Sequence, residues 1–179
     1  MYNNILNFCF NEASSQKFFE KDLGFDELLR ARFTHILEQA AAAEFYTWRR
    51  SIEGRLAEII VLDQFSRNIY RNTPNAFSQD SMALALAQEA VAAGILEELK
   101  HVDERKFILM PYMHSESKLI HQQAELLFKQ FTNAENSHSE MKHKVIIDCF
   151  GRYPHRNKIL GRTSTVEEID FLRQSNSSF

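Results

Sequence analysis

The sequence predicts an all-helical protein, and three observations lead to that prediction. Its 179 residues include only five glycines and three prolines, below the average usage of about 7% and 5%. These residues fall between segments whose apolar side chains recur at spacings of three and four, as on one face of an α-helix. No run of strand length alternates between apolar and polar residues, so we expect no β-sheet.

The periodic segments give the positions of the helices. The clearest covers residues 24–43, where Phe25, Leu29, Phe33 and Ile36 follow the helical spacing. Apolar periodicity predicts further helices at 51–71, 79–93, 103–110, 115–131 and 136–150.

Capping residues mark the ends of some of these helices. Asp80 or Ser78 can cap the start of the helix at 79–93, and Gly94 suits the left-handed residue that follows a helix end. The last helix starts at Thr165, because Thr165 and the glutamate three positions later have the spacing of a capping box.

Residues 1–179 are expected to form one domain. The composition does not shift along the chain, and 179 residues are enough for a single sizeable core. Helices of about 12 to 20 residues joined by short turns suit a stack of antiparallel helix pairs.

Composition and charge exclude several classes of partner. The formal net charge is -3, and a sequence pI near 6.2 argues against nucleic-acid binding, which usually needs a strongly basic face. No apolar run approaches the roughly 20 residues that cross a bilayer, and the N-terminus lacks the basic region of a signal peptide. Cys9 and Cys149 are too few for a disulfide scaffold. We therefore expect a cytoplasmic protein with two buried thiols and no membrane contact; the oligomeric state is left open.

One face of residues 54–71 changes from apolar to polar along its length. Leu56 and Ile60 begin the stripe, and polar side chains continue it, namely Asp63, Gln64, Arg67 and Arg71. Asp63 and Arg67 are four positions apart, in the order that favours an ion pair on a helix. The pair is either a structural feature at the edge of the core or part of a polar site.

The predicted helix at 115–131 directs Glu116 into its apolar arc and His121 outside it. A carboxylate in a core is costly unless a cation pairs with it, and four arginines can supply one: Arg67, Arg71, Arg152 and Arg156. Ser115 is expected to cap this helix, which would leave His114 at the helix N-terminus, where free amide groups favour an anion. Alternatively, His114 is a half-buried histidine bonded to a backbone carbonyl.

The segment FGRYPHRNKILGR, residues 150–162, concentrates positive charge without any acid. Its polar and basic residues include Arg152, His155, Arg156, Asn157, Lys158 and Arg162. Gly151, Pro154 and Gly161 restrict the loop, so it can hold guanidinium groups in place for carboxylate or phosphate oxygens. His143, on the helix entering the loop, either shares this site or is an ordinary packed histidine.

Signatures of several enzyme classes are missing. Without GxGxxG, a P-loop or GxSxG, the sequence gives no support to dinucleotide binding, P-loop phosphoryl transfer or α/β-hydrolase chemistry. A metal set of His114 and Glu116 with His143 or His155 lacks an HExxH or ExxH pattern. Cys149 lies on an apolar helix face, which disfavours a nucleophile. We expect no cofactor and no metal.

Several long strings carry a family resemblance. GRLAEIIVLDQFSRNIYRNTPNAFSQD, PYMHSES and HKVIIDCFGRYPHRNKILGRTSTVEEIDFL occur in this order, before the ending SNSSF. Together they resemble the bacterial family catalogued as domain of unknown function 924. The resemblance implies an all-helical, tetratricopeptide-like superhelical stack, and it implies no catalytic assignment.

The resemblance extends to the candidate site. Residues matching the family strings are Asp63, Gln64, Arg67, Asn68, Arg71, His114, Glu116, His143, Arg152, His155, Arg156 and Asn157. The sequence departs from the family pattern at Asn7, Cys9, Ser66 and Ser117, where Asp, Trp, Pro and an acid are common. These departures leave the candidate site intact.

Three functions remain open. The first is a helical binding protein whose arginine-rich pocket receives an anionic small molecule, a phosphate or carboxylate, or the carboxylate end of a peptide. The second is an enzyme with Glu116 or His114 as acid or base and with Arg67, Arg152 and Arg156 as an oxyanion clamp. The third is an ionic network that orders the helices without a ligand. We favour binding, because the sequence offers cations but no clear nucleophile.

Overall fold

The computed structural model describes residues 1–13, 15–174 and 177. No residue in these ranges lies in a β-strand, and helices dominate throughout, which confirms the all-helical class. The ending SNSSF, apart from Ser177, lies outside the described residues.

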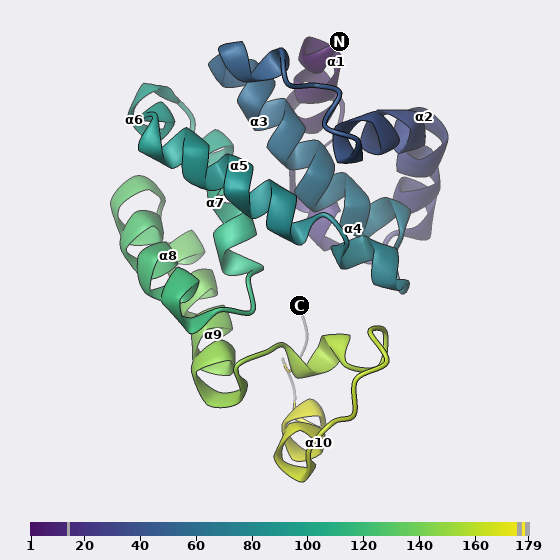
Figure 1. The fold of residues 1–179 in the computed structure, drawn as a ribbon, viewed down its shortest axis with the longest axis vertical. Helices are drawn as coiled ribbons and strands as arrows, with labels where there is room; N and C mark the ends of the chain where they lie inside the picture. Colours follow the sequence, from purple (N-terminus) through teal and green to yellow (C-terminus); the bar gives the residue numbers. More distant parts are fainter. Residues whose placement is uncertain (14, 175–176, 178–179) are drawn as a thin grey trace.

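Ten α-helices are assigned in the described chain (Figure 1). They are α1 (Tyr2–Asn7), α2 (Leu23–Ala41), α3 (Ile52–Ile60), α4 (Ser66–Ile69), α5 (Asp80–Ala92), α6 (Ile95–Glu98), α7 (Val102–Met113), α8 (Lys118–Phe131), α9 (Ala134–Phe150) and α10 (Val166–Leu172). Wider π-helical turns continue α1 through Phe8–Glu12 and join α3 to α4 through Val61–Phe65. The short helices α1 and α6 were not expected from periodicity.

Two predicted helix boundaries are wrong. Helix α7 continues through Pro111 to Met113, although a proline usually ends a helix. Helix α8 begins at Lys118 with Ser117 at its N-cap, so Ser115 does not cap it and His114 belongs to the end of α7.

Other caps follow the sequence signals. Thr165 Oγ1 accepts a hydrogen bond from Glu168 N, and Glu168 Oε2 accepts one from Thr165 N. These two bonds confirm the predicted capping box at α10. Gly94 and Gly151 have φ of 74° and 69°, in the left-handed region that ends helices.

The predicted cap of α5 is wrong, because Gln79 is the N-cap and Asp80 is the first helical residue. This leaves the Asp80 carboxylate available for other contacts.

The main core is an aromatic cluster shared by the N-terminal half and α7. Phe8, Phe18, Phe33 and Phe65 are buried, and the rings of Phe8 and Phe65 contact each other and both of the other two rings, with the Phe33 and Phe65 centroids 4.9 Å apart. A second, smaller cluster joins α9 to the segment after it through Ile146, Ile147 and Tyr153. Tyr153 therefore fixes the C-terminal segment against the helices.

Figure 1 shows how the chain closes on itself. Helices α8 and α9 lie side by side as a hairpin. After α9 the chain turns back and runs below the end of α4, and α10 packs at the far end of this segment. The tetratricopeptide-like stack and the assignment of residues 1–179 to one domain stay predictions.

The burial of the two cysteines and the presence of membrane-spanning helices can also be compared with the sequence predictions. Cys9 is buried as predicted, whereas Cys149 is exposed, so the prediction of two buried thiols is wrong for Cys149. Among the described residues, no helix is long and apolar enough to span a membrane.

Candidate functional site

A cavity of about 860 Å³ lies between the aromatic segment before α2, the helix α3 to α4, α7, α9 and the C-terminal loop. Five cations line it, namely Lys21, Arg67, Arg71, Lys106 and Arg156. Three histidines line it as well: His114, His143 and His155. Of the predicted site residues, the structure therefore brings together Arg67, Arg71, Arg156 and all three histidines around one space.

The π-helical turn Val61–Phe65 carries the buried floor of this site. All five of its residues are buried, including Asp63 and Gln64. Asp63 Oδ1 accepts hydrogen bonds from His114 Nδ1 at 2.7 Å and from Arg67 Nη2 at 3.3 Å. Gln64 Nε2 also donates to Asp63. Wide helical turns of this kind often occur at functional sites, and this one directs a buried carboxylate towards His114.

Asp63 is held as a carboxylate. Burial raises its pKa, but the interaction with His114, the charge of Arg67 and the hydrogen bonds that Asp63 accepts outweigh burial, so its pKa lies below the usual range. An ionised Asp63 requires His114 Nδ1 to be the protonated nitrogen. Within the described chain, His114 Nε2 makes no hydrogen bond and keeps a free lone pair.

Asp80 connects two arginines that come from distant parts of the sequence. Its Oδ1 accepts from Arg67 Nη2 at 2.9 Å, and its Oδ2 accepts from Arg156 Nη1 at 3.1 Å. The two guanidinium groups also share an aromatic ring, because Arg156 lies 4.6 Å and Arg67 5.4 Å from the centre of Phe77. Arg156 packs on Tyr153 as well, at 4.6 Å. These contacts fix both side chains in one orientation.

Each guanidinium group keeps unused donors. Arg67 Nε and Arg156 Nε are buried and have no hydrogen-bond partner among the described residues. A buried donor without an acceptor costs about 1–3 kcal/mol, so the protein holds these two side chains in place at a cost in stability.

Two of the histidines are neutral at physiological pH. Burial lowers the pKa of His143 to about 3. Burial and the charges of Arg156 and Arg67 lower the pKa of His155 to about 4. Burial and the charge of Arg67 also lower the pKa of His114, although Asp63 opposes them. The cavity is thus positive through its arginines and lysines while its histidines are uncharged.

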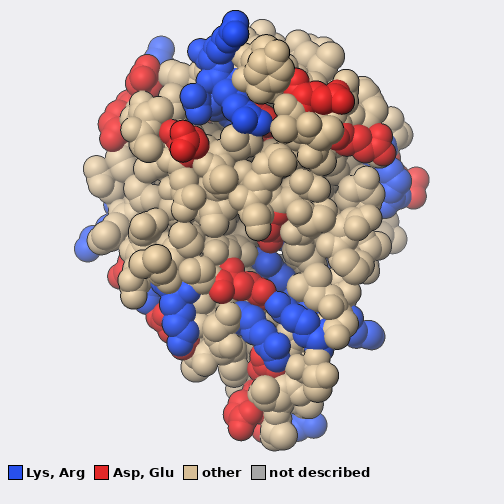
Figure 2. All heavy atoms as spheres, in the orientation of Figure 1, with Lys and Arg blue, Asp and Glu red and all other residues tan. Residues whose placement is uncertain are grey.

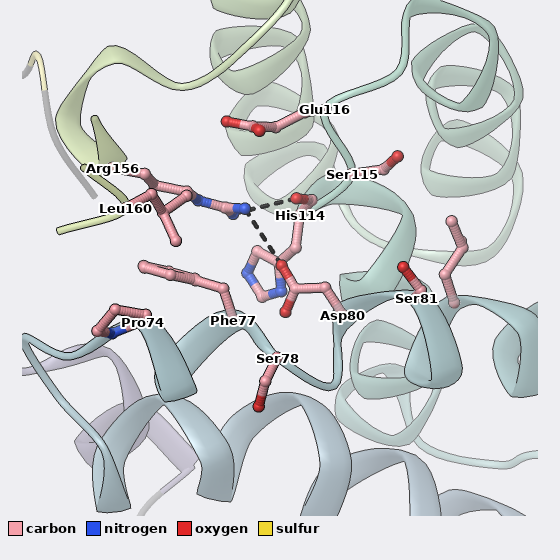
Figure 3. A pocket seen from close by; sticks show the side chains of 11 residues that line it. Pro74, Phe77, Ser78, Asp80, Ser81, His114, Ser115, Glu116, Arg156 and Leu160 are labelled. Atoms are coloured by element: carbon pink, nitrogen blue, oxygen red, sulfur yellow. Dashed lines mark hydrogen bonds and ion pairs between the residues drawn. The ribbon is translucent and has the colours of Figure 1, made fainter. Parts of the chain in front are cut away.

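A smaller cavity of about 340 Å³ lies on the other side of Arg156 (Figure 3). Arg156 points across it, with Nη2 donating to the His114 carbonyl at 3.0 Å and Nη1 reaching Asp80. His114, Phe77 and Arg156 line both cavities. The Arg156 and Asp80 pair therefore forms a wall between the two spaces.

Glu116 lines only the smaller cavity, and its carboxylate is fully engaged. Arg162 Nη1 and Nη2 donate to its two oxygens at 2.5 and 2.9 Å, and Tyr153 N donates at 2.7 Å. Burial raises the pKa of Glu116, but these donors prevail and its pKa is lowered. Glu116 pairs with a cation, as predicted. The partner is Arg162, whereas the sequence predicted one of Arg67, Arg71, Arg152 and Arg156.

Three further predicted residues serve the fold of the C-terminal segment or α2. Arg152 Nε and Nη2 donate to both oxygens of Glu168 on α10 and do not line either cavity. Asn157 donates to Glu168 Oε2 at 3.1 Å. Asn68 donates to Asp26 at 3.0 Å. Arg71, which also pairs with Asp26, lines the cavity at its edge.

The predicted outward orientation of His121 is wrong. His121 is fully buried, where Nδ1 meets Glu140 Oε1 at 2.7 Å and Nε2 lies 2.9 Å from the Ser115 carbonyl. Helix α9 packs on that face of α8, and a single helix cannot reveal which neighbour will cover it.

Charged side chains gather where the C-terminal segment meets the rest of the molecule. Figure 2 shows Lys, Arg, Asp and Glu residues of both signs along this junction, below a broad uncharged region. Across the described residues, no three His, Cys, Asp or Glu side chains form a group that could hold a metal ion.

Comparisons with known proteins agree with this architecture. Residues 5–176 match the family described as bacterial protein of unknown function, DUF924. The chain belongs to the DUF924 family. This confirms the resemblance carried by the three sequence strings, and no curated protein matches the chain.

A solved structure resembles this DUF924 chain over nearly its whole length. It is the "Structure of Protein of Unknown Function ATU0120 from Agrobacterium tumefaciens", with 34% sequence identity and a TM-score of 0.90. The match covers 96% of each chain. The two proteins therefore share their fold.

Some residues of the DUF924 site were not predicted from sequence. Asp80 was considered only as a helix cap, and Phe77, Tyr153, Lys21 and Lys106 were not considered. The string NAFSQD contains both Phe77 and Asp80 inside the family resemblance, which is the one signal that could have drawn attention to them.

Proposed function

We propose that this DUF924 protein binds an anionic small molecule in the larger cavity, with Arg67 and Arg156 as the anion-binding groups. The observation that carries the proposal is the pair of guanidinium groups that both line the larger cavity and are held there by shared contacts with Asp80 and Phe77. A carboxylate or phosphate oxygen is the acceptor that guanidinium groups match best.

The charges around the cavity support an anion. Three of the five lining cations pair with carboxylates of the protein, Arg67 with Asp63 and Asp80, Arg71 with Asp26, and Arg156 with Asp80. Lys21 and Lys106 form no ion pair with a described residue, and both lie on the lining. These two lysines are therefore available to an incoming anion in a partly enclosed space, where screening by water is reduced.

A second candidate is an acid–base enzyme that uses the same cavity. The specific observation in its favour is the pair of Asp63 and His114, in which the buried carboxylate orients the imidazole and leaves Nε2 as a proton acceptor. Arg67 and Arg156 would then stabilise negative charge on a bound substrate. Glu116 fits an acid–base role less well, because Arg162 and Tyr153 already occupy both of its oxygens.

The binding proposal differs from a purely structural ionic network in one measurable respect. A ligand at a hundred times its Kd stabilises the folded state by about 2.7 kcal/mol. We expect thermal unfolding to shift upwards with at least one member of a panel of phosphorylated and carboxylated compounds.

The matched variants are Arg156→Met and Arg173→Met. Arg173 is exposed and pairs only with Asp170 on α10, so its loss should leave the shift unchanged. Arg156→Met should abolish binding, measured by calorimetry at a temperature where circular dichroism shows the variant folded. Equal affinity in Arg156→Met and wild type would refute the assigned role of Arg156.

A further inference from the structure

The larger cavity has an apolar wall that an inorganic anion cannot use. Phe18, Phe19 and Leu23 line it from the segment before and at the start of α2, and Met110 and Met113 line it from α7. Met110 and Met113 are three positions apart and therefore lie on the same face of their helix. Methionine side chains adapt to varied apolar shapes.

This wall and the two arginines belong to different aromatic clusters. Phe18 packs on Phe65 and Phe107, within the core of the N-terminal half. Arg156 packs instead on Phe77 and Tyr153. No ring contact links Phe18 or Phe19 with Phe77 or Tyr153 among the described residues. The lining therefore has an anion-binding end, around Arg67 and Arg156, and an apolar end, around Phe18, Phe19 and Leu23, where Arg71 and Lys106 also contact the N-terminal segment.

The apolar end is held in place by Arg71, which lies just beyond the end of α4. One turn beyond Arg67, Arg71 Nη2 donates to the Glu20 carbonyl at 3.2 Å, and Arg71 also binds both oxygens of Asp26. These bonds fix the segment containing Phe18 and Phe19 at a set distance from the anion-binding end. Lys106 Nζ lies 4.1 Å from the centre of the Phe19 ring and covers its outer face.

Volume favours an organic ligand. About 860 Å³ lies within the range of roughly 300–1,000 Å³ typical of sites for drug-sized molecules, and it far exceeds the space of a phosphate or carboxylate group alone. From the volume and from the apolar wall in the same lining as the two arginines, we infer that the ligand is an amphiphilic anion, a carboxylate or phosphate group attached to an apolar chain or ring. This inference rests on the proposed anion-binding function.

Affinity for a homologous series tests this ligand class. The probes are acetate, butyrate, hexanoate and octanoate, with inorganic phosphate and hexyl phosphate as the second series. Each buried methylene contributes about 0.8 kcal/mol, so Kd should fall about fourfold for each added CH₂ until the apolar end is filled. Calorimetry with the wild-type protein measures the slope. Affinity that does not depend on chain length overturns the inference.

One double variant tests which part of the probe the apolar end recognises. Phe19 and Leu23 are 44% and 75% exposed, so the double variant Phe19→Ser, Leu23→Ser should fold normally. It should weaken octanoate binding and flatten the chain-length slope while acetate binds unchanged. An unchanged slope in this variant also overturns the inference.

Failure of the anion-binding proposal is distinguishable from failure of the ligand class. If hexanol binds as tightly as hexanoate, the apolar wall binds but the arginines do not, and the proposed function fails. If inorganic phosphate binds as tightly as hexyl phosphate and binding is lost in Arg156→Met, the proposed function stands and the amphiphilic ligand is wrong. If no probe of either series binds, both are wrong.

Discussion

Asp80 and Arg156 form an ion pair of 3.1 Å although they lie 76 positions apart in the sequence. The pair joins the first residue of α5 to the C-terminal loop, and through the second oxygen of Asp80 it also reaches Arg67. One carboxylate therefore holds two guanidinium groups beside the same cavity. Its position makes Asp80 both a support for the two arginines and a competitor for any anion that they bind.

Asp80→Asn should separate these two effects. Loss of the carboxylate removes two charge-assisted bonds, and we expect the free energy of unfolding to fall by about 1–3 kcal/mol. Loss of its negative charge should tighten anion binding severalfold, because the arginines no longer share their charge with Asp80. Urea unfolding measures the first effect and calorimetry with octanoate the second. Asp170→Asn, at the exposed pair with Arg173, is the control; equal or weaker binding in Asp80→Asn would contradict the assignment.

Glu116→Gln should affect stability and spare ligand binding. The variant keeps the shape of the side chain but weakens two bonds from Arg162 and one from Tyr153 N. We expect the free energy of unfolding to fall by about 1–3 kcal/mol, with a coupling to Arg162→Met of about 0.5–3 kcal/mol in a double-mutant cycle. Octanoate affinity should stay within twofold of wild type. A tenfold loss of affinity in folded Glu116→Gln would instead place Glu116 in the binding site.

Arg152→Ala should loosen α10 without changing the cavity. Arg152 binds both oxygens of Glu168 and lowers the pKa of that carboxyl to about 2. Without Arg152, amide hydrogens of α10 should exchange faster, which hydrogen-exchange mass spectrometry detects. Arg173→Ala removes an exposed pair of the same helix and should have little effect. Protection of α10 that is identical in wild type and Arg152→Ala would rule out this structural role.

Stability should fall as the pH drops below about 6.5. His143 and His155 have pKa values of about 3 and 4 in the folded protein, below the ordinary histidine value of about 6.5. At a pH between its folded and unfolded pKa values, each histidine is protonated in the unfolded chain and neutral in the folded chain. Each histidine therefore makes the free energy of unfolding rise with pH, with a slope approaching about 1.4 kcal/mol per pH unit. This stability is complete above pH 6.5 and is lost towards pH 4.

Two measurements check the pH dependence. Urea unfolding between pH 7 and pH 4 gives the slope, and His143→Gln should reduce it because one buried neutral imidazole is absent. Titration of the imidazole resonances by NMR gives the pKa values directly. A His143 resonance that titrates near 6.5 would contradict the burial of this side chain.

Local signals were sufficient to predict most of the longer helices. Spacings of three and four located α2, α5 and α9 closely, and the Thr165 capping box and Gly151 marked real helix ends. Pro111 misled the prediction for α7, because a proline inside a helix is tolerated here. Such exceptions depend on tertiary packing, which single-helix periodicity does not contain.

The candidate site was predictable only in part. The polar stripe correctly identified Asp63 and Arg67 as an ion pair, since both residues lie on one helix. The partners Asp80 with Arg156 and Glu116 with Arg162 lie 76 and 46 positions apart, and no local pattern encodes contacts over such separations. All three arginines of the loop at residues 150–162 bind carboxylates of the protein, and of the three only Arg156 also lines the larger cavity.

The most direct test of the anion-binding claim is a crystal structure of the wild-type protein soaked with phenylarsonate. Its arsenic atom gives an anomalous signal, and its ring supplies the apolar part of the ligand. The account predicts an arsenic peak in the larger cavity with arsonate oxygens within about 3.2 Å of guanidinium nitrogens of Arg67 and Arg156, and with the ring towards Met110 and Phe19. Arsenic found only outside this cavity, or an unoccupied cavity at saturating phenylarsonate, would contradict it.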